Sequence, residues 1–136
     1  MRKVLLIGLL FIVPTIIFAQ GETRLTIDER LYDVFDTSFL ERMQKETPAM
    51  LEYYNFFLDN VYTIQSLGEN KVSDYLKITI DDIEDMNILK IITDYEIKRD
   101  YNNQIIYQIE DSDKLLILIS EKELAKKFNK HTRRTH

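Results

Sequence analysis

The stretch that decides the fold is Asn87–Ser120, with the sequence NILKIITDYEIKRDYNNQIIYQIEDSDKLLILIS. It contains three apolar runs separated by turn-forming residues: Ile88–Ile97, Ile105–Ile109 and Leu115–Ile119. The runs are rich in β-branched residues, and the first two alternate between apolar and polar positions. This alternation is typical of half-buried strands. The sequence therefore predicts a C-terminal three-stranded antiparallel meander.

The third run differs from the first two because Leu115–Ile119 is apolar at every position. A strand of this kind is covered on both faces or lies in the middle of its sheet. Ser120 follows directly, with Glu123 three residues later, which is the pattern of a capping box at a helix N-terminus. We therefore expect a C-terminal helix, and either this helix or a partner must cover the second face of the strand.

Two helices are predicted before the sheet. Apolar residues recur at i+4 from Asp28 to Lys45, which indicates one amphipathic helix. Thr47 and Pro48 suit the N-cap and first position of a second helix, which extends to Asp59 and is the most aromatic segment of the chain. Short strands at Val61–Ile64 and Tyr75–Ile80 complete the pattern.

These segments predict an α+β fold with two N-terminal helices, an antiparallel or mixed sheet of four or five short strands, and one C-terminal helix. The apolar face of the sheet is expected to pack on the aromatic helix. A turn is expected at Gly68–Asn70 and a brief helical turn at Asp82–Met86. We expect one domain over residues 20–130, followed by a mobile basic tail over residues 131–136.

The first residues have the layout of a secretory signal peptide, which would span residues 1–19. A basic start is followed by the apolar stretch Val4–Phe18, and cleavage is expected between Ala19 and Gln20. The apolar stretch is shorter than the roughly 20 residues that span a bilayer as a helix. The alternative is an uncleaved leader, which would hold the protein at a membrane. After cleavage we expect the exported protein in the periplasm, outside the cell or at the cell surface.

The Phe18-Ala19-Gln20 ending resembles the signal peptides of Bacteroidota, in which Gln often opens the mature chain. This resemblance covers the leader alone. The rest of the chain is similar to the many small exported Bacteroidota proteins of unknown function, and it carries no motif that assigns a site. The resemblance implies an exported protein.

Charge is distributed unevenly along the chain. Residues 124–136 contain five basic residues and no acid, whereas residues 20–123 carry a net charge of −12. An acidic body argues against nucleic-acid binding. The basic tail suits either a solvated end, which is the simpler interpretation, or contact with an anionic surface such as lipid head groups or an acidic partner.

The chain lacks the residues that several common kinds of catalytic and cofactor site require. The chain has no Cys, and its two histidines, His131 and His136, both lie in the predicted tail. Thiol catalysis, Ser-His-Asp catalysis and a zinc site are therefore not expected. Gly68 is the only glycine after Gly21, so a glycine-rich phosphate loop is excluded. We expect no cofactor and no metal.

Carboxylates are the one abundant catalytic group. The densest cluster, Asp81, Asp82, Glu84 and Asp85, stands where helix-start acids are favoured, and a structural role explains it better than catalysis. A hydrolase with a carboxylate pair is therefore the least favoured function.

The candidate contact residues lie on the aromatic helix: Tyr53, Phe56 and Phe57. Phe56 points roughly opposite to the apolar stripe of this helix, so it is covered by another element or is free for a partner. The sequence favours a non-enzymatic protein that contacts an envelope protein partner through Phe56 or a free sheet edge. The alternative is a binder of an apolar or carbohydrate ligand, in a pocket between the aromatic helix and the sheet.

Overall fold

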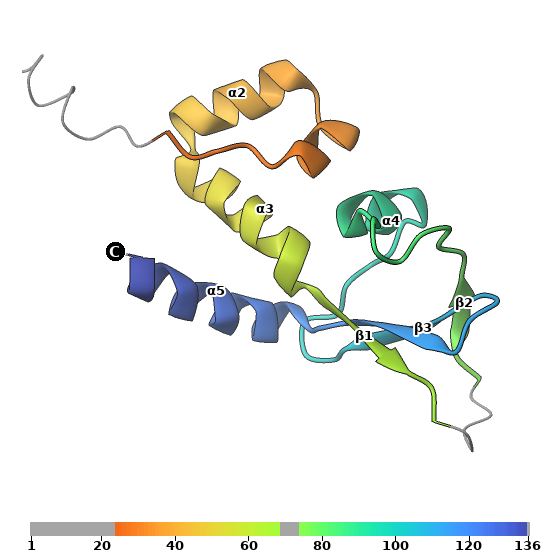
Figure 1. The fold of residues 1–136 in the computed structure, drawn as a ribbon. Coiled ribbons are helices and arrows are strands. Elements are labelled where there is room, and N and C mark those ends of the chain that lie inside the picture. Colours follow the sequence, from red (N-terminus) through yellow and green to blue (C-terminus); the bar gives the residue numbers. More distant parts are fainter. Residues whose placement is uncertain (1–23, 69–73, 136) are drawn as a thin grey trace, which may run out of the picture.

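The computed structural model describes residues 24–68 and 74–135 (Figure 1). The predicted signal peptide and residues 69–70 of the predicted turn lie outside these ranges. The described part has an α+β fold, as expected. In chain order its elements are the 3₁₀ helix η1 (Glu29–Asp33), α2 (Thr37–Glu46), α3 (Pro48–Asn60), β1 (Tyr62–Ser66), β2 (Leu76–Ile78), α4 (Ile88–Asp94), β3 (Ile105–Ile109), β4 (Lys114–Leu118) and α5 (Glu121–Thr135).

The first predicted helix is interrupted. The chain forms η1, leaves the helical conformation and starts again as α2. Asp28 and Asp36 both have extended backbone angles directly before a helix, and the Asp28 side chain accepts a hydrogen bond from the Arg30 amide. Short acidic side chains favour such start positions over helix interiors. The prediction of one continuous helix was therefore wrong, whereas the predicted aromatic helix is confirmed as α3 with Pro48 in its first turn.

The first strand of the predicted meander is a helix, α4, so that prediction was wrong. The Asn87 side chain caps it, because its Oδ1 atom accepts hydrogen bonds from the amides of Leu89 and Lys90 at 3.2 and 3.3 Å. Ile88 and Leu89 are buried in the core. The cap and this burial outweigh the strand preference of the β-branched residues.

The sheet is mixed and has four strands in the order β1-β4-β3-β2. β3 and β4 form the predicted antiparallel hairpin, and β1 pairs antiparallel with the other side of β4. β2 pairs parallel with β3, which requires a crossover connection, and α4 lies within that connection. A β-α-β unit thus replaces the first hairpin of the predicted meander.

The third run was expected to be covered on both faces or central in the sheet, and the central position is confirmed because β4 lies between β1 and β3. One core cluster joins Leu58 of α3, Ile88 of α4 and Leu116 of β4. On the other face of β4, Leu115 and Ile117 are also buried, although they lie outside this cluster. The α5 helix runs away from the end of the sheet (Figure 1).

Side chains on neighbouring strands flank these two residues on the second face. Paired residues point to the same side of a sheet. Ile117 lies between Thr63 and Ile106, and Leu115 lies between Gln65 and Gln108.

α5 is longer than predicted. It begins where the capping box placed it, with the Ser120 hydroxyl accepting a hydrogen bond from the Glu123 amide at 3.2 Å. It continues to Thr135, so residues 131–135, which the sequence assigned to a tail, are helical. Leu124 of α5 is buried in the core, and Phe128 packs on α3.

Candidate functional site

An aromatic cluster joins α3 to α5. The Phe128 ring lies 5.2 Å from the Tyr53 ring and 5.3 Å from the Phe56 ring, measured between centroids. The His131 ring lies 5.0 Å from the Phe56 ring. Phe128 and His131 are three residues apart and therefore share one face of α5. α5 thus covers Phe56 from within the chain.

The structure separates the three predicted contact residues. Phe57 is buried, and the Arg99 guanidinium lies over its ring at 5.4 Å, which is a cation–π geometry. Tyr53 is half-buried and packs edge-on against Tyr54 and Phe128. Of the three, Phe56 lines the groove described next. Sequence reasoning missed His131, although its spacing of three and seven residues from Phe128 and Leu124 indicates a shared helix face.

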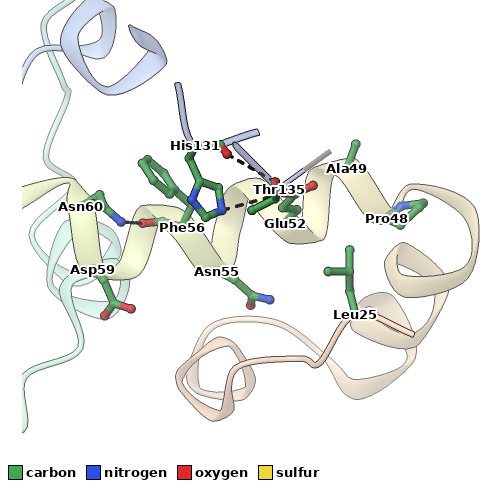
Figure 2. A pocket seen from close by; sticks show the side chains of 10 residues that line it. All are labelled: Leu25, Pro48, Ala49, Glu52, Asn55, Phe56, Asp59, Asn60, His131 and Thr135. Atoms are coloured by element: carbon green, nitrogen blue, oxygen red, sulfur yellow. Dashed lines mark hydrogen bonds and ion pairs between the residues drawn. The ribbon is translucent and has the colours of Figure 1, made fainter. Parts of the chain in front are cut away.

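An open groove of about 1000 Å³ runs along α3 beside the C-terminal end of α5 (Figure 2). The apolar side chains in its lining include Leu25, Pro48 and Phe56. His131 Nε2 lies 4.0 Å from a Glu52 carboxylate oxygen. The complete lining is Leu25, Pro48, Ala49, Glu52, Asn55, Phe56, Asp59, Asn60, His131 and Thr135.

Other polar side chains of the groove are hydrogen-bonded or ion-paired within the chain. The Asn55 amide donates to the Thr26 carbonyl at 2.7 Å and accepts from the Asp28 amide at 3.2 Å. The Asp59 carboxylate lies 2.9 Å from the Arg30 guanidinium, which also pairs with Asp28. These groups are therefore engaged within the chain, while the Asp59 side chain, 66% exposed, keeps acceptor sites open to the groove.

The pair formed by Asp28 and Arg30 anchors η1 next to the groove. The Asp28 carboxylate accepts two hydrogen bonds from the Arg30 guanidinium, at 2.9 and 2.7 Å. These bonds lower the pKa of Asp28 below its usual value of 3.8. They also raise the pKa of Arg30, together with the hydrogen bond to Asp59. The network is structural, since it ties η1 to the end of α3.

The free edge of β1 is a second candidate contact surface. The residues that flank β1 bond to those that flank β4. The Val61 carbonyl accepts a hydrogen bond from the Ile119 amide, and the Leu67 amide donates one to the Asp113 carbonyl. Hydrogen-bonded residues alternate along an antiparallel pair. Thr63 and Gln65 therefore also face β4, whereas the backbone groups of Tyr62, Ile64 and Ser66 face away from it. Within the described ranges, no residue forms a backbone hydrogen bond to these outward groups.

The opposite edge of the sheet is protected. In the parallel pair with β3, Ile78 faces inward, since its carbonyl accepts from the Glu110 amide at 2.9 Å. The next residue, Thr79, faces outward, and the Tyr95 hydroxyl bonds to both its amide and its carbonyl at 3.2 Å. β2 has only three residues, and the central one is Lys77. A short strand, an edge lysine and a covering side chain all oppose further strand pairing.

The acidic cluster forms a non-helical turn where the sequence predicted a brief helical turn. The Asp82 carboxylate accepts hydrogen bonds from the amides of Glu84 and Asp85, at 2.9 and 3.4 Å, as in an Asx turn. In the part of the chain that the structure describes, no group of three or more His, Asp or Glu side chains is placed to hold a metal ion.

No helix among residues 24–68 and 74–135 is long and apolar enough to cross a membrane. No family model, curated protein or solved structure matches the chain.

Proposed function

We propose that the chain is an exported, non-enzymatic protein that contacts a partner protein by adding an extended segment of that partner to the edge of β1. One observation carries the proposal: within residues 24–68 and 74–135, no backbone group pairs with the outward amides and carbonyls of Tyr62, Ile64 and Ser66. The other edge strand, β2, has three residues and a central lysine, and Tyr95 covers the adjacent Thr79. An unprotected strand edge is a template for pairing with another chain.

The pattern of β1 defines the partner segment. Tyr62 and Ile64 pack against the core cluster, whereas Thr63 and Gln65 are exposed on the opposite face. A strand added beside β1 continues both faces of the sheet. The partner segment therefore alternates over about five residues, with apolar side chains beside Tyr62 and Ile64 and polar ones beside Thr63 and Gln65.

Charge favours a different protein over a second copy as the partner. β1 contains no charged residue, so the strand itself repels neither a second copy of the chain nor a different protein. Residues 20–123 carry a net charge of −12, and two acidic bodies brought edge to edge repel each other. A neutral or basic partner does not meet this repulsion.

Hydrogen exchange tests the geometry of the edge in the isolated protein. We expect the amides of Ile64 and Ser66 to exchange quickly and those of Thr63 and Gln65 to be protected. Equal protection of all four amides would mean that the edge is already occupied, and would contradict the proposal.

Affinity capture from the native envelope tests the contact itself. The variant Ser66→Pro removes an outward backbone donor at an exposed position and leaves the backbone hydrogen bonds to β4 intact. It also removes the side-chain hydrogen bond that Lys114 Nζ of β4 donates to the Ser66 hydroxyl at 3.1 Å. Gln65→Lys adds an edge charge, and Gln108→Lys makes the same change on the interior strand β3 as a matched control. We expect the wild type and Gln108→Lys to retain one stoichiometric partner that both edge variants lose. Retention by all four proteins would refute the role of β1.

A second candidate function is binding of an apolar or carbohydrate ligand in the α3–α5 groove. It is supported by the size of the groove and by Phe56 in its lining. The groove does not lie in the predicted place, which was a pocket between the aromatic helix and the sheet. Tyr53 and Phe57, which were expected to line that pocket, pack into the protein. Phe56→Ala should abolish ligand binding and leave partner capture through β1 unchanged, so the two candidates are separable.

A further inference from the structure

The outward face of α5 is a continuous stripe of basic side chains. At about 100° per residue, Leu124, Phe128 and His131 point toward α3 and the core, as their burial and ring contacts confirm. The residues on the opposite side are exposed, and they are mostly cations. They comprise Lys122, Lys126, Asn129, Lys130, Arg133 and, near the edge of this face, Arg134. The exposed acid Glu123 lies at the same edge as Arg134.

These cations are not neutralised within the described chain. Lys127, at the side of the helix, lies 3.9 Å from Glu123. None of the five cations in the stripe forms an ion pair with residues 24–68 or 74–135. The last four of them, together with Asn129, border a shallow open depression of about 570 Å³. Lysine and arginine placed this close to one another repel, and an anionic partner relieves that repulsion.

We propose that the outward face of α5 binds the surface of a membrane that contains anionic phospholipids. From Lys122 to Arg134 the stripe is about 18 Å long at 1.5 Å per residue. A row of flexible cations along a straight helix matches a surface that offers negative charge at many positions. The charge of the rest of the chain orients the protein, because the acidic part that precedes α5 is repelled by a negative surface while the outward face of α5 is attracted to it.

The composition of the stripe favours a lipid surface over an acidic protein. Specific protein interfaces have aromatic or aliphatic anchors at their centre. The outward face of α5 has none, since Phe128 is turned inward. Because the apolar residues of α5 belong to the core, the helix lies on the head groups and does not insert. Binding therefore depends on charge and weakens with salt.

Co-sedimentation of the folded protein with lipid vesicles tests the proposal. The probe is phosphatidylcholine vesicles with about one third phosphatidylglycerol, compared with phosphatidylcholine alone. We expect binding to the anionic vesicles only. No binding to them, equal binding to both, or stronger binding to soluble polyglutamate would overturn the proposal. So would a loss caused by inorganic phosphate beyond that caused by chloride at equal ionic strength, which would indicate a phosphate-ion site.

The stripe is tested with a triple variant and a control of equal charge. The variant is Lys126→Gln, Lys130→Gln and Arg133→Gln, which keeps good helix formers at exposed positions. Each cation at an anionic surface contributes about fivefold, so the partition coefficient should fall roughly 100-fold. The control replaces exposed Lys45, Lys77 and Lys98 by Gln and should change binding less than about threefold. Equal losses would show that net charge alone drives binding and would overturn the proposal.

Discussion

Replacing Phe128 by alanine tests whether α5 is held on α3 by the aromatic cluster. The half-buried Phe128 ring packs against Tyr53 and Phe56 at centroid distances of 5.2 and 5.3 Å. Truncation of a core phenylalanine costs about 3 to 5 kcal/mol. Partial exposure of Phe128 reduces this to about 2 kcal/mol of unfolding free energy. The melting temperature should then fall by about 9 °C, since the unfolding entropy of roughly 110 residues is about 0.2 kcal/mol/K.

A double-mutant cycle isolates the contact between the two helices. We expect Phe56→Ala and Phe128→Ala to couple by about 1 kcal/mol in urea unfolding, because the rings touch each other. Tyr53→Phe keeps the ring and is the control, with an expected change below about 0.5 kcal/mol. Additive effects of the two alanine variants, with an unchanged melting temperature for Phe128→Ala, would refute the docking of α5 on α3.

Three further substitutions test the second face of the sheet, the ion pair between Asp28 and Arg30, and the N-cap of α4. Ile117→Asp should unfold the domain, since it buries a charge without a partner, whereas Thr63→Asp at the paired exposed position should be tolerated in the same thermal melt. Because Arg30 lowers the pKa of Asp28, the carboxylate stabilises the fold above pH 3.8 and this contribution is lost as the pH falls through the lowered pKa. Asp28→Asn should therefore cost about 1 kcal/mol at pH 7, and its difference from the wild type should shrink below pH 3.8 in urea titrations. Asn87→Ala should cost about 1 to 2 kcal/mol in the same titrations, by removing the cap of α4.

For each of these three substitutions, one outcome would contradict the prediction. A folded Ile117→Asp protein would mean that this face of β4 is open to water. A pH-independent difference for Asp28→Asn would mean that its carboxylate is not the stabilising group. A neutral Asn87→Ala would mean that α4 is held by burial alone.

Local patterns in the sequence predicted α3, the β3–β4 hairpin and the start of α5, because each has a period and a boundary signal of its own. The run from Ile88 fits two periods at once: alternate residues suit a strand, while Ile88, Ile91 and Ile92 also suit one helix face. The cap supplied by Asn87 decides between them. That cap was the signal missed, since asparagine before an apolar run reads as a helix start.

The candidate contact surfaces were predictable only in part. Phe56 was predicted either to be covered by another element or to be free for a partner, and α5 packs against it through Phe128 and His131. The sequence predicted that this helix would end before His131. β1 lies at the edge because of the strand order in the sheet. The sequence of a five-residue strand does not show which distant strands it pairs with, so this edge position could not be predicted. The protection of the other edge by Tyr95 is likewise a tertiary contact, sixteen residues from its partner Thr79.

The central place of β4 has a consequence for the order in which the chain acquires its fold. β1 and β3 each pair with β4, yet β4 is synthesised after the other three strands of the described sheet. Until Lys114–Leu118 is available, β1 has no neighbouring strand to pair with. Its apolar side chains then have no sheet face to extend. Such distant pairings slow folding. The helices can therefore form from local contacts while the sheet is still open, and the sheet closes only when β4 joins it.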